Sequence, residues 1–203
     1  MKIALIGATG HAGSRILAEL VDRGHHVTGI ARDTTKVKAH PRVTPTAADA
    51  SDPDRLSSVV AGHDAVISAI RFVDSDPRKL IAAVKAAGVK RYLVVGGAGS
   101  LEVAPGRRLV DAPSFPAAAR AEALRGAAFL GALRDERSLE WTFLSPSASF
   151  TPGRRTGTFR LGGDQLLTDD TGQSGISFED FAVALTDELE TPRHVRQRFT
   201  VGY

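Results

Sequence analysis

The chain has 203 residues, of which 42% are hydrophobic and 24% are charged, so it can bury an ordinary core and is not disordered as a whole. It has no cysteine, which excludes a disulfide framework, a thiolate-held metal site and a cysteine nucleophile. The net charge of +3 is typical of an ordinary surface rather than of a nucleic-acid-binding one. No segment approaches the roughly 20 apolar residues of a membrane span, and the apolar run over residues 3–6 is too short for a secretory signal.

Short β-branched runs alternate with alanine- and leucine-rich segments, which is the pattern of βαβ units on a parallel sheet. Strands are expected at 3–6, 26–31, 43–46, 64–69, 91–95 and 139–144. Helices are expected at about 12–23, from Pro53 onward, at 77–87 and at about 115–135. The glycines and prolines of residues 96–114 predict an irregular loop.

The pattern changes beyond residue 150. Residues 158–161 and 165–168 flank a Gly-Gly-Asp turn and predict a β-hairpin or a strand followed by a turn. A helix is expected over 177–190, followed by a strand at 197–201 that the alternating arginines Arg196 and Arg198 mark as a sheet edge. The whole pattern predicts an α/β fold with a doubly wound parallel sheet. We expect a single domain over residues 1–203, with a core over about 1–150 and a small C-terminal elaboration over about 151–203.

Three glycines at a spacing of three residues, Gly7, Gly10 and Gly13, lie between the first strand and the first helix. Gly7 permits a tight turn, Gly10 leaves the backbone open to a diphosphate, and Gly13 lets the helix pack close to the sheet. The N-terminus of the helix offers free N–H groups and a partial positive charge. In this strand–turn–helix context the glycines predict a dinucleotide-binding Rossmann fold, with a purely structural turn as the alternative.

The end of the second strand indicates which dinucleotide is bound. Enzymes that use NAD usually present a carboxylate there to the ribose 2′-hydroxyl. This chain has Arg32, whose guanidinium matches a 2′-phosphate and therefore favours NADP(H), with Lys36 as a second candidate contact. The alternative is that Asp33 takes the role of that carboxylate, Arg32 is a solvated surface residue, and the cofactor is NAD(H).

Four segments carry a family resemblance. The sequences GATGHAG, VTGIARD, DAVISAI and GVKRYLVVGGAGSLEVAPG resemble those of the atypical short-chain dehydrogenases. The closest group is the small proteins described as NADH-flavin reductases, and their neighbours are the NmrA-like proteins and the biliverdin reductase B type. The likeness continues through WTFLSPSASF and RLGGDQLL to RQRFTVGY. It implies NAD(P)H binding and hydride transfer.

The resemblance also implies which residues contact the cofactor. Thr9, His11 and Ala12 would line the diphosphate, and Asp49, followed by Ala50, would bond the adenine amino group. For Asp49 a helix-capping or loop role is the alternative. A second group, at the ends of the later strands, would border the ribose, diphosphate and nicotinamide: Ser68, Ala69, Ile70, Gly96, Gly97, Ser145 and Pro146. All these positions follow predicted strands at their carboxyl ends, where open α/β sheets bind ligands.

The side-chain acid of the ordinary short-chain dehydrogenases is missing. Those enzymes pair a tyrosine with a lysine one helical turn away, and the lysine lowers the pKa of the phenol. Where relatives often carry that pair, this chain has Ala119-Arg120. Hydride transfer to a flavin or quinone needs mainly the alignment of two flat rings, because the proton can come from solvent. Ser100 and Arg120 are candidates to polarise the acceptor, with loop and surface roles as the alternative.

Other chemistries lack their motifs. The six histidines show no metal-ligand spacing, and there is neither a Gly-x-Ser-x-Gly elbow nor a Gly-Lys-Ser/Thr phosphate loop. Our first hypothesis is a cytoplasmic NAD(P)H-dependent oxidoreductase, a monomer or homodimer, that passes hydride to a flavin or quinone-like small molecule. The C-terminal elaboration would complete its acceptor pocket. The alternative is a non-catalytic NADP(H) sensor of the NmrA type that acts through a protein partner. An epimerase or dehydratase that acts on a nucleotide sugar is less favoured, because few residues follow the strand predicted at 139–144.

Overall fold

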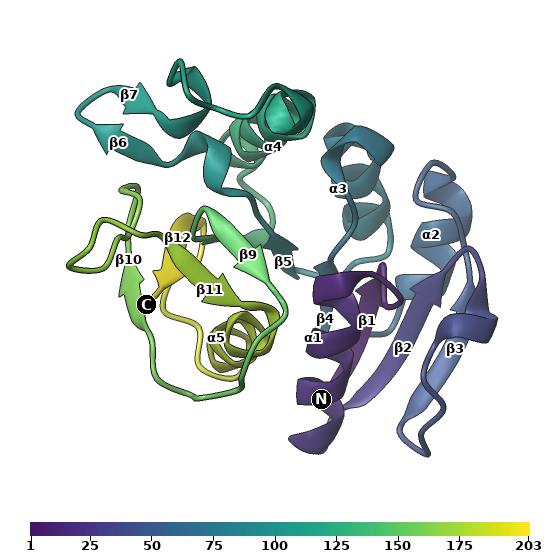
Figure 1. Ribbon diagram of the computed structural model, residues 1–203. Coiled ribbons are helices and arrows are strands. Elements are labelled where there is room, and N and C mark those ends of the chain that lie inside the picture. The colour runs from purple at the N-terminus through teal and green to yellow at the C-terminus, as the bar shows by residue number, and fades with distance from the viewer.

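Eight strands form one central sheet in the computed structural model, which describes residues 1–203 (Figure 1). In spatial order the strands are β10 (Arg160–Gly162), β12 (Gln197–Gly202), β8 (Glu140–Pro146), β5 (Arg91–Val95), β4 (Ala65–Ser68), β1 (Lys2–Ile6), β2 (His26–Ala31) and β3 (Val43–Ala47). Seven are parallel, and β10 alone is antiparallel to its neighbour. The strand order reverses between β1 and β4, so a crevice opens there at the carboxyl ends of the strands. The predicted doubly wound α/β fold is confirmed.

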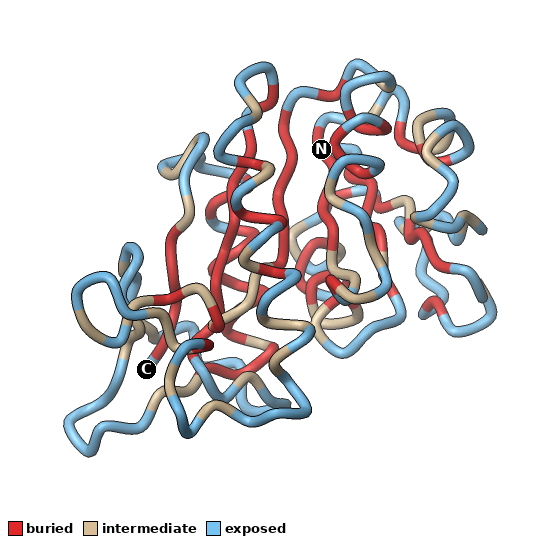
Figure 2. The backbone as a smooth tube through the Cα atoms, turned by 90° about the horizontal axis from the view of Figure 1, so that it is seen from above, coloured by how far each residue is buried: buried red, intermediate tan, exposed pale blue.

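Five helices cover the two faces of this sheet. They are α1 (His11–Asp22), α2 (Pro53–Val60), α3 (Pro77–Ala86), α4 (Ala117–Asp135) and α5 (Phe178–Glu190). Helices α1 and α5 pack with one apolar cluster on one face, and α2, α3 and α4 pack with a second cluster on the other. Figure 2 shows buried residues concentrated along the central strands. Strands covered on both sides must be apolar throughout, which explains why their sequences do not alternate.

Local chemistry fixes the starts of three helices. Asp52 and Asp76 cap α2 and α3 and are each followed by a proline, and Ser177 caps α5 by accepting the N–H of Asp180. These are the residue types that satisfy the free N–H groups of a helix start. Helix α1 differs, because Gly10 precedes it and supplies no side-chain cap.

Two expectations for the C-terminal quarter were wrong. Residues 158–168 form no hairpin: β10 pairs with β12, and Gln165 makes only an isolated bridge to Glu102. Strand β12 is not a sheet edge, since it lies between β8 and β10. The Arg198 side chain is 3% exposed and its Nε donates to Asp164 at 2.6 Å. The alternating pattern had placed this charge at an exposed edge, but the guanidinium is buried and pairs with the half-exposed Asp164.

The loop predicted over residues 96–114 contains a small hairpin of β6 (Glu102–Ala104) and β7 (Arg107–Arg108). A further two-stranded sheet joins β9 (Ser149–Thr151) and β11 (Gly175–Ser177) in parallel. Both lie beside the carboxyl ends of the central strands (Figure 1). Neither extends the main sheet, and β9 contributes Phe150 to the wall of the crevice.

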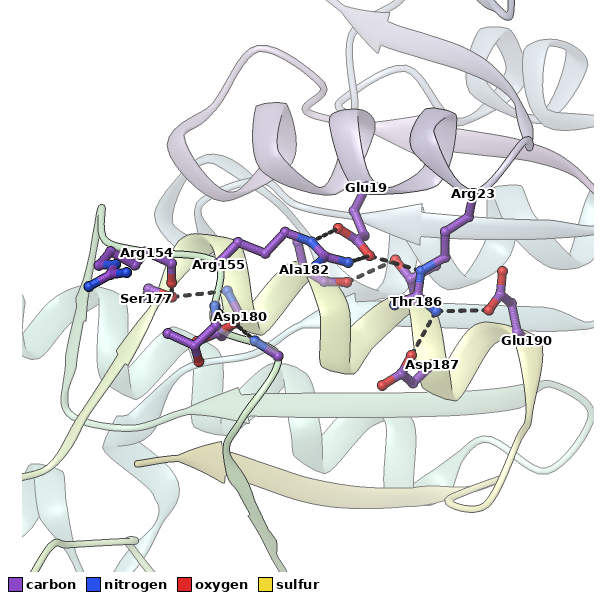
Figure 3. A network of polar contacts seen from close by, with 12 residues as sticks. Glu19, Arg23, Arg154, Arg155, Ser177, Asp180, Ala182, Thr186, Asp187 and Glu190 are labelled. Carbon is purple, nitrogen blue, oxygen red and sulfur yellow. Dashed lines mark hydrogen bonds and ion pairs between the residues drawn. The ribbon is translucent and has the colours of Figure 1, made fainter.

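A polar network joins α1 to α5 and to the segment before it (Figure 3). Glu19, 4% exposed, accepts from both Arg23 and Arg155 at 2.8 Å, and Arg23 also reaches Asp187 at 2.6 Å. Despite the cost of burial, hydrogen bonding to Arg155, aided by Arg23, holds the pKa of Glu19 below its usual range. The buried Glu19 carboxylate thus has two cationic partners, which offset the cost of burying its charge.

A second buried charge pair involves Arg91, the first residue of β5. Arg91 Nη2 donates to Glu188 Oε1 at 3.0 Å, with side chains 8% and 3% exposed. Glu188 also accepts the backbone N–H groups of Arg193 and His194, and the His194 ring lies 2.8 Å away. Burial opposes its charge, but the hydrogen bonds from His194 and Arg193 lower its pKa overall.

Glu188→Gln should destabilise the fold by about 3–5 kcal/mol, because it leaves the buried Arg91 charge without its counter-ion. The matched control is Asp187→Asn on the same helix. Asp187 is 55% exposed, so its loss should cost about 1 kcal/mol or less. Urea unfolding measures both values, and equal midpoints for the two variants would contradict the expected difference.

Candidate functional site

The glycine loop is built by one very close approach of helix to strand. A Cβ at Gly13 would lie 2.0 Å from the carbonyl oxygen of Gly7, and Gly7 itself has φ +86°. A Cβ at Gly7 would also lie 2.6 Å from the Ala69 carbonyl oxygen. No side chain is tolerated at either position, so both glycines are required by the protein itself.

Gly10 has a different environment. It is exposed, with ordinary extended backbone, and a Cβ there would approach no atom closer than 3.4 Å. The fold therefore does not require a glycine at this position, whereas a diphosphate on the backbone would. Behind it, the first turn of α1 has no side-chain cap and no acidic residue. Its N–H groups and partial positive charge suit an anion.

A cleft of about 240 Å³ extends from this loop toward β2 and β3. Arg32 and Asp49 line it, and Arg32 is exposed with no ion pair or hydrogen bond to its side chain. Asp33 does not line the cleft. Its carboxylate accepts the N–H of Thr35 at 3.1 Å and the Thr35 hydroxyl at 2.6 Å, and it lies 3.6 Å from Lys36. Because Asp33 caps the turn over Thr34–Lys36, only Arg32 of this pair faces the cleft.

Asp49 holds its own loop while lining the same cleft. Its Oδ1 accepts the Ser51 N–H at 2.8 Å. This bond, together with the Ser51 side chain and the nearby charges of Arg32 and Lys79, keeps the Asp49 pKa below its usual range. The charged carboxylate is an acceptor suited to an amino group such as that of adenine.

A second cleft of about 640 Å³ extends in the other direction, past Gly96 and Gly97. Four phenylalanines wall it: Phe72, Phe115, Phe150 and Phe178. The Phe150 and Phe178 rings meet edge to face with centroids 4.5 Å apart, and the His11 ring is stacked on Phe178 at 5.8 Å. Helix α4 contributes small residues, Ala119, Ala123 and Gly126. Such a surface suits flat, apolar ring systems.

The two clefts meet at one junction. Four residues line both: Gly10, Ala69, Ile70 and Arg71. A dinucleotide consists of two nucleosides joined by a diphosphate, so the junction suits the diphosphate and the clefts suit the two nucleosides. The two clefts and their junction thus match the outline of an extended dinucleotide.

Most residues that the sequence singled out line one of these clefts: Gly7, Thr9, Gly10, His11, Ala12, Arg32, Asp49, Ala50, Ala69, Ile70, Gly96, Gly97 and Pro146. Gly13, Ser68 and Ser145 do not. Ser68 and Ser145 are buried, 3% and 0% exposed. The family resemblance and the strand-end position had indicated these serines, but a position at a strand end does not determine which face a side chain takes.

Neither candidate for polarising the acceptor reaches the cleft. Ser100 lies beside the buried Arg198, with 3.3 Å between its hydroxyl and Nη1. Arg120 donates to the Val110 carbonyl at 2.8 Å and lies over the Phe115 ring at 5.7 Å. Arg120 thus braces the segment that carries Phe115, and the cleft-facing position beside it is Ala119.

Three cleft residues were not predicted from the sequence. Arg71 is exposed and makes no side-chain bond, Phe72 is 6% exposed, and Glu122 on α4 accepts the backbone N–H groups of Phe72 and Val73. Glu122 lies about 50 positions from the turn that it holds, and only the tertiary structure brings the two together. Arg71 could have been suspected, because it follows the strand-end segment Ser68–Ile70.

Other parts of the molecule do not resemble a site. No group of three or more His, Asp or Glu side chains is arranged to hold a metal. A groove of about 770 Å³ between α3 and α4 is lined by surface residues such as Arg78, Lys85 and Glu136 and lies away from the carboxyl ends of the strands. No helix is both long and apolar enough to span a bilayer.

Comparisons with known proteins agree with this geometry. Residues 7–192 match the NAD(P)H-binding family. YwnB of Bacillus subtilis, a protein of uncharacterised activity, is 41% identical over 99% of this chain and 98% of its own length. A Bacteroides thetaiotaomicron structure, provisionally described as an epimerase, is 44% identical with a TM-score of 0.95 and covers 100% of this chain and 96% of that one. A Streptococcus pneumoniae structure, provisionally described as an NADH-flavin reductase, is 36% identical with a TM-score of 0.83, covering 100% and 99%.

The glycine loop, the uncapped helix start and the two joined clefts lie within the matched residues. The match covers nearly the whole chain, and the relatives are similar over their full lengths. The chain therefore belongs to the NAD(P)H-binding family.

Proposed function

We propose that the protein is an NADPH-dependent reductase that transfers hydride to a flat, apolar acceptor of the flavin or quinone class. The observation that carries the proposal is the phenylalanine-walled cleft of about 640 Å³ beyond Gly96 and Gly97. A nicotinamide occupies only part of such a space, so a second ring has room beside it. The provisional NADH-flavin reductase of Streptococcus pneumoniae supports this class of acceptor.

Electrostatics favour NADPH over NADH. Arg32 is a free cation in the smaller cleft, whereas Asp33 is occupied by Thr35 and Lys36. A guanidinium stabilises a 2′-phosphate through charge-assisted hydrogen bonds, and a carboxylate aimed at the same place would repel it. Arg71 at the junction supplies a second free cation for the diphosphate.

NADPH, when bound, supplies the hydride. The residues of the larger cleft align the acceptor ring and exclude water from it, and hydride from the cofactor plus a proton from solvent give the reduced acceptor and NADP⁺. No side chain is needed as an acid, which agrees with Ala119 where a phenol would otherwise stand. We retain the cytoplasm as the location, because that compartment supplies reduced nicotinamide nucleotides.

The reductase activity can be tested with one blocking variant. The purified protein should oxidise NADPH in the presence of at least one flavin or quinone from a panel. Ala119→Phe places a ring in the larger cleft and should lower kcat/KM at least about tenfold, because it displaces the acceptor. Its affinity for ADP, which fits the smaller cleft and the junction alone, should change little, since Ala119 lines neither.

The control is Ala118→Phe, an exposed neighbour on the same helix that lines neither cleft. It should retain wild-type turnover. The contrary outcome is that the wild type binds NADPH and yet oxidises it no faster than background with every flavin and quinone of the panel. In that case the reductase proposal fails, and a non-catalytic sensor of the NmrA type becomes the better explanation.

Gly10→Val should weaken NADPH binding by more than about tenfold, because its side chain occupies the place of the diphosphate and blocks the N–H groups behind it. The melting temperature should change little, since the backbone there is extended and uncrowded. Calorimetry measures the affinity. Gly131→Ala is the control, because a Cβ there meets no atom within 4 Å. Unchanged NADPH affinity in Gly10→Val would refute the cofactor assignment.

Arg32→Ala should remove most of the preference for NADPH over NADH. A charge-assisted contact is worth roughly 1.5–3 kcal/mol, so the wild type should prefer NADPH about tenfold to a hundredfold. The NADH affinity of the variant should stay close to that of the wild type. The measurement is the ratio of the two dissociation constants at fixed ionic strength, because exposed charges are screened.

The control for this variant is Arg42→Ala, which removes an equal charge from an exposed arginine outside both clefts. Its ratio should match that of the wild type. A wild-type ratio near one, or a preference for NADH, would mean that Arg32 does not contact a 2′-phosphate.

A further inference from the structure

Glu122 is the only acidic residue that lines the larger cleft, and both of its oxygens are occupied. Oε1 accepts the N–H of Phe72 at 2.8 Å, and Oε2 accepts the N–H of Val73 at 2.9 Å. These two groups belong to the short turn that follows β4. One carboxylate on α4 thus holds two consecutive amides of a segment on the other side of the cleft.

The turn that Glu122 holds carries Arg71. The Arg71 side chain is exposed, has no ion pair or hydrogen bond, and is the only charged residue at the junction of the two clefts. Phe72 anchors the same turn from its other side, because its ring packs against Phe129 and Phe143 with centroids 5.4 and 6.0 Å away. The backbone of the turn is therefore fixed, while the Arg71 guanidinium remains free for a ligand.

We propose that Glu122 is a positioning residue, which fixes the turn over residues 71–73 so that Arg71 faces the diphosphate of the cofactor. The inference rests on the proposed function for the placement of that diphosphate. Glu122 does not act as the proton donor, since its two oxygens both accept backbone N–H groups. Glu122 acts through Arg71: an arginine on a fixed backbone loses less conformational entropy when it binds the diphosphate, so its contact is stronger.

The direction in which Glu122→Gln changes the affinity for the diphosphate distinguishes this role from a simple effect of charge. Glu122→Gln removes a negative charge near the phosphates, which by charge alone should tighten the binding of an anion. It also replaces one acceptor oxygen by an NH₂ group, which cannot accept the second N–H of the turn. Positioning therefore predicts weaker binding, by roughly twofold to tenfold, the value of one net hydrogen bond.

Two nucleotide probes make the test specific to the diphosphate. ADP carries adenosine and a diphosphate, whereas 2′-AMP carries adenosine and a 2′-phosphate only. Arg71→Gln should raise the dissociation constant of ADP about tenfold or more and leave that of 2′-AMP nearly unchanged. Glu122→Gln should act in the same direction on ADP alone. In the Arg71→Gln background, Glu122→Gln should add less than about twofold, because its effect passes through Arg71.

Glu136→Gln is the matched control, since Glu136 follows the C-terminal end of the same helix, holds the Ser138 N–H and lies outside both of these clefts. It should alter neither dissociation constant. If Glu122→Gln is too unstable to purify, amide hydrogen exchange of the wild type replaces it: Phe72 and Val73 should be protected before any nucleotide is added. Unprotected amides, unchanged or tighter ADP binding by Glu122→Gln, or equal weakening of ADP and 2′-AMP would each overturn the positioning role. Failure of the wild type to bind NADPH at all would overturn the proposed function as well.

Discussion

The close approach of α1 to the end of β1 is the constraint on which the site depends. Gly13 packs so near the Gly7 carbonyl that a single added carbon would lie 2.0 Å from its oxygen. This contact points the start of the helix at the gap between β1 and β4, where the strand order reverses. The uncapped N–H groups, the junction of the two clefts and the free cations around it all follow from that one orientation.

Most acidic side chains at the clefts are engaged by the protein itself. Asp49 and Glu122, which line the clefts, accept backbone N–H groups of turns, and so does Asp33 just outside them. Asp74, which lines the smaller cleft, has no such bond. The two cations, Arg32 and Arg71, have no such partners. Asp49 and Glu122 thus shape the walls, and the two arginines remain available to anionic groups of a ligand. The same residue types elsewhere, such as Arg91 and Glu188, neutralise one another in the core.

The sequence predicted what local patterns encode. Continuous apolar runs identified the parallel strands, and the spacing of Gly7, Gly10 and Gly13 identified the loop, because each signal lies within a few residues of its effect. The hairpin over 158–168 and the edge position of Arg198 were wrong, since both depend on which distant strand is the neighbour. The contact of Glu122 with the turn over residues 71–73 could not be predicted for the same reason, since it joins segments far apart in the chain. Ser68 and Ser145 show that a strand's end can be located without knowing which way its side chain points.

The contact between α1 and α5 has a consequence for how the molecule folds. Arg15 and Glu179 bond at 3.0 Å although 164 positions separate them in the chain, and β12 completes the sheet beside β8 from some 55 positions away. Closing such long loops costs entropy before any contact compensates for it, so topologies of this kind fold slowly. The β1–β4 half needs no residue beyond Ser68 to pair its strands, whereas the α1 face stays uncovered until α5 arrives. During that interval the apolar residues of α1 are exposed to neighbouring chains, which favours aggregation.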